Sequence, residues 1–149
     1  MENNLIKADY TTMPGMFDEC NLKYFNHSLP RPKYGLMQKK HVLGRFECNM
    51  DKGKKHPIKW QKISFSECYD YTEEEFRNLM VHEMIHYYLA WNGIDTKCSH
   101  GKDFIKMAEE MNTKYGLNIT KNIDSSTYHR NEKEPTYKGI FPLLMENLF

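Results

Sequence analysis

The feature that most constrains this chain is a stretch from Thr72 to Trp91 with the pattern of one long helix. Thr72 and Glu75 have the spacing of a capping box, and acidic residues fill the first turn, where the helix dipole favours negative charge. The stretch is followed by Asn92-Gly93, and glycine readily adopts the left-handed conformation that ends helices. The pattern therefore predicts a helix over residues 72–91.

This predicted helix carries two histidines and a glutamate in the run His82-Glu83-Met84-Ile85-His86. Residues four apart share a helix face, so both imidazoles can reach one metal ion. Neutral imidazole suits Zn²⁺, and Glu83 is placed to act as general base toward a metal-activated water. The alternative is two packed or surface histidines that have helical spacing without any metal.

A catalytic zinc site usually has three protein ligands and one open position. The metzincin pattern would place a histidine six residues after His86, but that position holds Asn92. A glutamate from the following helix, Glu109 or Glu110, is one candidate for the third ligand. His100 is favoured, because it lies directly before that helix and the glycine after it allows close backbone approach.

Two further helices are predicted from apolar residues that recur at spacings of three and four. The first covers residues 12–27, capped by Thr11 or Thr12 and ended by the prolines of 29–32. The second follows Gly101 and stops at Gly116. Its expected apolar stripe consists of Phe104, Ile105, Ala108, Met111 and Tyr115.

Three short segments have the composition of strands, at residues 34–37, 42–48 and 58–65. We expect them to form a small antiparallel sheet, with the segment 58–65 at its edge, where an extended peptide could add as a further strand. Residues 118–137 are polar and without periodicity. The apolar segment 140–149 is expected to pack on the domain.

The length of 149 residues fits one domain, and 40% hydrophobic residues suffice for a core. No apolar run approaches the ~18 residues that span a bilayer, and the start of the chain does not resemble a secretory signal, so we expect no membrane association and a cytoplasmic location. The four cysteines form no C-x-x-C pair, and we expect reduced, mostly buried thiols.

Charge is distributed unevenly along the chain. The segment Lys23–Lys62 holds eleven Lys or Arg and two acidic residues, an excess of nine positive charges, although the whole chain carries only +1. Such a segment is typical of a surface that binds nucleic acid, or of a solvated face balanced by acidic residues elsewhere. The second hypothesis for function is therefore a nucleic-acid-binding or regulatory module in which zinc is structural.

The combination of H-E-M-I-H with the later run S-H-G-K-D-F resembles the SprT-like zinc metallopeptidase family, which includes the bacterial SprT proteins and the protease domain of Spartan. The resemblance covers roughly residues 10–116, and residues 117–149 would be a C-terminal extension. Many members add a zinc ribbon, whereas this sequence has no cysteine after Cys98. The matching motif residues are His82, Glu83, His86, His100, Gly101 and Phe104.

The resemblance implies a zincin-like α+β core, with a small sheet packed on the active-site helix and flanking helices. It implies His82, His86 and His100 as zinc ligands and Glu83 as general base and later proton donor. The implied activity is that of an endopeptidase on a protein or peptide substrate, on or near DNA. Asp95 and Asp103 are acidic residues near the ligands in sequence and receive no assigned role. The sequence does not choose an oxyanion-stabilising residue among Tyr87, Tyr88, Tyr128, His129 and Arg130.

Overall fold

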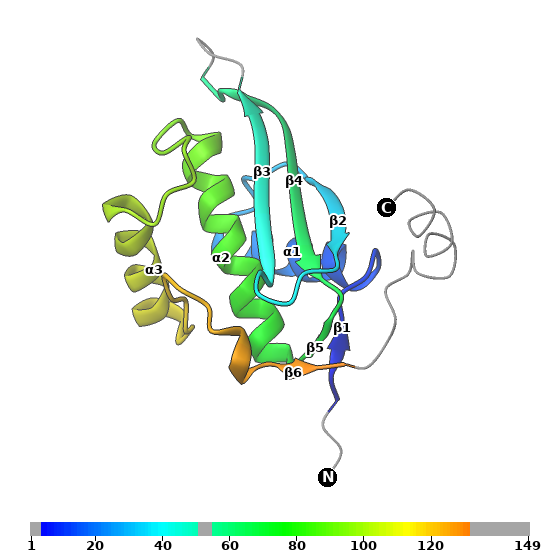
Figure 1. Cartoon of the computed structure of the whole chain (residues 1–149). Helices are drawn as coiled ribbons and strands as arrows, with labels where there is room; N and C mark the ends of the chain where they lie inside the picture. The colour runs from blue at the N-terminus through cyan, green and yellow to red at the C-terminus, as the bar shows by residue number, and fades with distance from the viewer. Residues whose placement is uncertain (1–3, 51–54, 132–149) are drawn as a thin grey trace, which may run out of the picture.

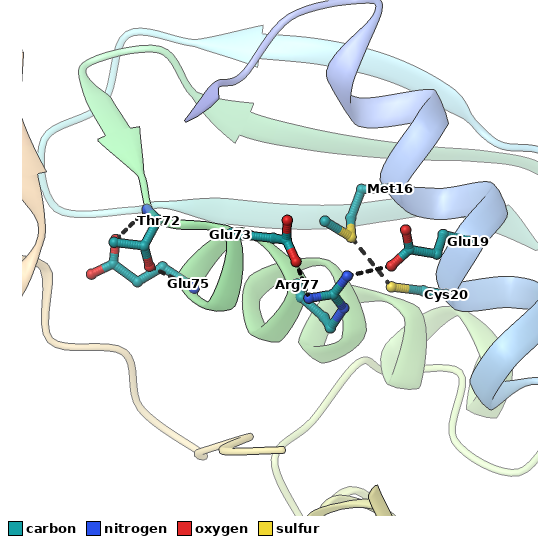
Figure 2. Close-up of polar contacts among 7 residues, drawn as sticks. All are labelled: Met16, Glu19, Cys20, Thr72, Glu73, Glu75 and Arg77. Atoms are coloured by element: carbon teal, nitrogen blue, oxygen red, sulfur yellow. Dashed lines mark hydrogen bonds and ion pairs between the residues drawn. The ribbon is translucent and has the colours of Figure 1, made fainter. Parts of the chain in front are cut away.

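The predicted central helix forms as α2, Glu73–Trp91 (Figure 1). In the computed structural model, which describes residues 4–50 and 55–131, both bonds of the capping box are present (Figure 2). The Thr72 hydroxyl accepts from the Glu75 backbone N–H at 3.1 Å, and the Glu75 carboxylate accepts from the Thr72 N–H at 2.8 Å. The second half of α2 is almost entirely buried, so the helix crosses the core.

Helix α2 packs most closely against α1 (Thr12–Tyr24), α3 (Lys102–Tyr115) and β3 (Gly44–Met50), and less closely against two further strands. In Figure 1, α2 lies between α3 and the sheet that contains β3. This mixture of helices and sheets confirms the predicted α+β class. No helix among the described residues combines the length and apolar character that a membrane span requires.

The larger sheet has the strand order β2-β4-β3, with β2 at Lys33–Met37 and β4 at Ile58–Ser66. All three predicted strands exist, but two expectations are wrong. Strand β4 is central rather than at the edge, and it pairs in parallel with β2 while pairing antiparallel with β3, so the sheet is mixed. The last four residues of β4 are all buried, and burial on both faces is typical of a central strand.

A second sheet, which the sequence analysis did not predict, has the order β1-β5-β6 with antiparallel pairs. Its strands are two or three residues long, which is too short for alternation to show in the sequence. It joins distant parts of the chain and includes part of the segment predicted to lack structure, where the short helix η1, Ser125–Thr127, also lies. The strands are Ile6–Lys7, Tyr69–Tyr71 and His129–Arg130.

The first helix, α1, is shorter than predicted. It ends at Tyr24, because Asn26 and His27 both adopt left-handed backbone conformations at φ 56° before the prolines. Its cap also differs from the prediction: neither Thr11 nor Thr12 caps it through its side chain, and the Asp9 carboxylate instead accepts the N–H groups of both threonines, at 2.8 and 2.7 Å.

Helix α3 confirms the prediction at its end, where Gly116 closes it in the left-handed conformation at φ 68°. Phe104, Ala108 and Met111 are buried as expected, whereas Ile105 is 37% exposed. All four cysteines are free thiols, but only Cys20 is buried and the other three are half-buried. The predicted packing of residues 140–149 lies outside the described part of the chain.

Candidate metal centre

Three imidazoles that come from two different elements converge at one point. The Nε2 atom of His100, in the loop before α3, lies 3.2 Å from Nε2 of His82 and 3.1 Å from Nε2 of His86. Three nitrogens that bind one zinc ion tetrahedrally at 2.0–2.1 Å lie about 3.4 Å apart, so these separations fit a single ion. The described residues thus bring together a group that could hold a metal.

The α2 backbone positions two of these ligands, and the loop of residues 92–101 positions the third. Cys98 has a left-handed backbone at φ 54°, and Gly101 is the extended N-cap residue of α3. The loop thus returns toward α2 and brings His100 over the other two imidazoles. The alternative ligands Glu109 and Glu110 are both exposed on α3.

The aromatic ring of Phe104, on the first turns of α3, packs against all three imidazoles. Its centroid lies 4.8 Å from that of His82, 4.7 Å from that of His86 and 4.9 Å from that of His100. The Phe104 side chain is fully buried. The sequence analysis placed this residue in the motif and on the apolar stripe of the helix but gave it no role at the metal centre, and the structure shows that it is the common packing surface of the three imidazoles.

Hydrogen bonding to the far side of a ligand imidazole fixes its orientation and tautomer. Nδ1 of His82 lies 3.0 Å from the backbone carbonyl oxygen of Thr120. Nδ1 of His86 is buried without a hydrogen-bond partner among the described residues. The nearby Asp95 carboxylate acts on His86 through its charge, and it shapes the loop by accepting bonds from the Ser99 hydroxyl and the Lys97 N–H.

Burial keeps these imidazoles in the neutral state that binds metal. Desolvation, with a smaller contribution from the neighbouring histidines, lowers the pKa of His82 to about 3. Desolvation and His100 lower the pKa of His86 to about 4. The pKa of His100 is also lowered, by desolvation first and then by Lys121.

Glu83 lies on the same helix between the two histidines and is 4% exposed. Burial raises the pKa of its carboxyl group to about 8, and the positive charge of Arg45 opposes this only in part. In the absence of a cation this carboxyl is therefore mostly protonated at neutral pH, and a bound metal ion would favour its ionised form.

The site opens into a cleft of about 230 Å³. The sequence analysis did not assign the walls of this cleft, since they come from the β2–β3 loop and from the segment after α3. The lining residues are His41, Val42, Leu43, Gly44, His82, Glu83, His100, Lys121, Asn122 and Ile123.

The five candidates for oxyanion stabilisation do not line this cleft. The Tyr87 hydroxyl donates to the carbonyl oxygen of Pro30 at 2.6 Å. Tyr128 packs edge-on against Tyr69 and Tyr71. The basic residue types in the cleft wall outside the three-histidine group are His41 and Lys121, and no motif in the sequence indicated them.

The fold and this centre define the class of protein: an α+β domain with a three-histidine group that could bind a metal ion. The SprT-like family model matches residues 13–129, and the chain belongs to this family. The match extends past residue 116, the expected end of the core, and includes the segment that borders the cleft. A search of curated proteins gives no match.

Proposed function

We propose that this protein is a zinc-dependent endopeptidase that hydrolyses peptide bonds of protein or peptide substrates. The observation that carries the proposal is the convergence of three Nε2 atoms beside a buried glutamate, at the floor of an open cleft. A structural zinc site does not require a general base, and its ligand set is usually closed by a fourth side chain. Residues 1–149 would form one domain around this centre.

His82, His86 and His100 would hold the ion. An all-imidazole donor set suits zinc, although copper and nickel also accept imidazole. Zinc in such a site lowers the pKa of water to about 7 and polarises a substrate carbonyl group.

Glu83 would move the proton in this reaction. Its carboxylate takes a proton from the attacking water and later delivers it to the leaving amide nitrogen, so one group acts as base and then as acid. The burial that raises its pKa to about 8 makes both roles accessible near neutral pH. The three imidazoles orient the reacting groups around this carboxylate.

The substrate would bind along β3 rather than along β4, which the sequence analysis favoured. Strand β3 is at one edge of the larger sheet and begins at Gly44, in the wall of the cleft. An extended peptide that pairs with this edge would pass in front of Glu83, and the backbone hydrogen bonds would depend little on peptide sequence.

The direct test is cleavage of an unfolded protein substrate by the zinc-loaded chain, with Glu83→Gln as the matched variant. We expect wild-type cleavage, and a loss of at least about 10²–10⁴-fold in Glu83→Gln with full zinc content, since removal of a general base costs this much. Equal cleavage by both proteins would show a contaminating protease and would contradict the proposal.

The second candidate function, nucleic-acid binding with a structural zinc, rests on the basic segment Lys23–Lys62. Eight of its described basic residues are exposed, on α1, β2, β3, β4 and the loops between them. Binding to single-stranded DNA that weakens steeply with salt would support this function, alone or beside proteolysis in a cytoplasmic protein. DNA binding without cleavage, by a protein whose zinc has four protein ligands, would favour it over the peptidase.

A further inference from the structure

Gly44, the first residue of β3, lies against the side chain of Glu83. A Cβ atom built on Gly44 would lie 2.8 Å from Oε2 of Glu83 and 3.0 Å from Cδ1 of Leu79. The first separation is closer than carbon and oxygen atoms approach without repulsion. Any side chain at position 44 and the Glu83 carboxylate in its present place therefore exclude one another.

The reason for glycine here is space and not backbone conformation. Gly93 and Gly116 are the described glycines with positive φ, at 69° and 68°, and both follow helices. Gly44 is in an extended strand, paired with Phe65 of β4, where any residue could adopt the backbone. The Glu83 carboxylate occupies the space that a side chain at position 44 would fill.

A side chain at position 44 would displace the carboxylate in a particular direction. Leu79, one turn before Glu83 on α2, is 1% exposed, so its side chain has little free space to move into. Helix α2 is held by α1 and α3 on its other sides. The open space beside Glu83 is the cleft that it shares with His82 and His100, so the carboxylate would move there.

We propose that Gly44 is a positioning residue: the absence of a side chain at the start of the edge strand sets where the Glu83 carboxylate lies relative to the three imidazoles. Its consequence for catalysis rests on the proposed peptidase function, whereas the contact itself does not. A shift of about 1 Å in a reacting group costs roughly 10²-fold in rate. A glutamate at position 83 is therefore not sufficient for full activity, and its carboxylate must also lie at the correct distance from the imidazoles.

The chain offers a matched control in Gly15, on α1, where an added Cβ would meet nothing within 4 Å. Gly44→Ala and Gly15→Ala make the same chemical change. In the full-length protein, we expect Gly44→Ala to lower kcat about 10²-fold while KM and zinc content stay within twofold. Gly15→Ala should leave all three values unchanged. An unchanged kcat in Gly44→Ala would overturn the proposal.

A second measurement tests the contact between Gly44 and Glu83 without relying on enzymatic activity. Thermal unfolding of the full-length protein is compared for wild type, Gly44→Ala, Glu83→Ala and the double variant. We expect Gly44→Ala to lower Tm by roughly 3–8 °C in the wild-type background, and by less than half as much when residue 83 is alanine. Equal losses in both backgrounds would overturn the proposal.

The two measurements separate the failure of this inference from the failure of the proposed function. A wild-type protein that cleaves nothing would contradict the peptidase, and the unfolding comparison would still decide whether Gly44 positions Glu83. Should Gly44→Ala fail to fold, folding of the double variant would support the contact. If neither Gly44→Ala nor the double variant folds, the added methyl group clashes with a residue other than Glu83, and the inference is overturned.

Discussion

The two halves of α2 differ in how their polar side chains are partnered. In the first half, Arg77 pairs with Glu19 of α1 and with Glu73 at 3.1 Å, and Thr72 and Glu75 form the capping box (Figure 2). These contacts pair most of the polar groups there within the protein, although Nε of Arg77 is buried without a hydrogen-bond partner among the described residues. In the second half, the side chains of His82, Glu83 and His86 are buried, and Nε2 of each histidine faces Nε2 of His100.

The contacts of the first half stabilise the helix, whereas the buried side chains of the second half form the candidate metal centre. Close imidazole nitrogens satisfy one another poorly, because each neutral ring has one donor and one acceptor, and Nδ1 of His86 has no partner among the described residues. Buried polar groups without mutual satisfaction cost stability. Such an arrangement of imidazoles is explained if a cation completes it, whereas the Arg77 guanidinium in the first half of α2 is already paired with two carboxylates.

The largest expected effect comes from removing a ligand in the second half. His86→Ala should lower zinc affinity by roughly 10²–10³-fold, since a zinc site of about 10–16 kcal/mol is shared among few ligands. Proteolysis should disappear with the metal. Zinc affinity measured by competition with a chelator checks this, and His27→Ala, at a histidine remote from the centre in sequence and exposed on the surface, is the control. Wild-type affinity in His86→Ala would remove that residue from the site.

The next effect concerns the ring beneath the ligands. Phe104→Ala should destabilise the protein by about 3–5 kcal/mol, as for other buried aromatic residues, and should also weaken zinc binding about 10-fold because the three imidazoles lose their common support. Denaturant unfolding and chelator competition measure the two effects. Met111→Ala removes another buried side chain of α3 and should destabilise the protein without the second effect. Equal zinc affinities in both variants would show that Phe104 is only a core residue.

The smallest effect belongs to the first half of the helix. Thr72→Ala should cost about 1 kcal/mol of unfolding free energy, because the Glu75 N–H loses its side-chain acceptor. Zinc affinity and kcat should stay at wild-type values. Urea denaturation with zinc titration of the same sample checks both. A fall in zinc affinity comparable to that in Phe104→Ala would show that the two halves of α2 are coupled. It would contradict the view that only the second half contributes to metal binding.

The sequence could predict the features that depend on residues close together along the chain. Helix α2, its cap and the pair of histidines depend on residues within a few positions of one another, and these predictions are confirmed as structure. The convergence of His100 was favoured by its place before α3 and by a family resemblance. The order β2-β4-β3 could not be predicted, because pairing of strands is not encoded in a local pattern. Apolar and polar residues alternate only imperfectly over residues 58–65, with Ile63 and Phe65 on the opposite face from Ile58 and Trp60, and this pattern is the signal in the sequence that the strand has apolar residues on both faces.

Other parts of the site depend on contacts between distant segments. Thr120 reaches His82 through a backbone carbonyl, which any residue type supplies, so no side chain could indicate it. His41 and Lys121 line the cleft from polar loops without periodicity. Gly44 precedes the buried part of a strand, and only the position of Glu83 in space shows why that residue is glycine.

The central claim is that His82, His86 and His100 bind one zinc ion together. X-ray absorption at the zinc edge of the purified, full-length protein tests it most directly. The account predicts about one zinc per chain, with three imidazole nitrogens at about 2.0–2.1 Å and one further light-atom ligand. Sulfur scattering at about 2.3 Å, which would place a cysteine such as Cys98 in the site, or a protein that retains no zinc, would contradict it.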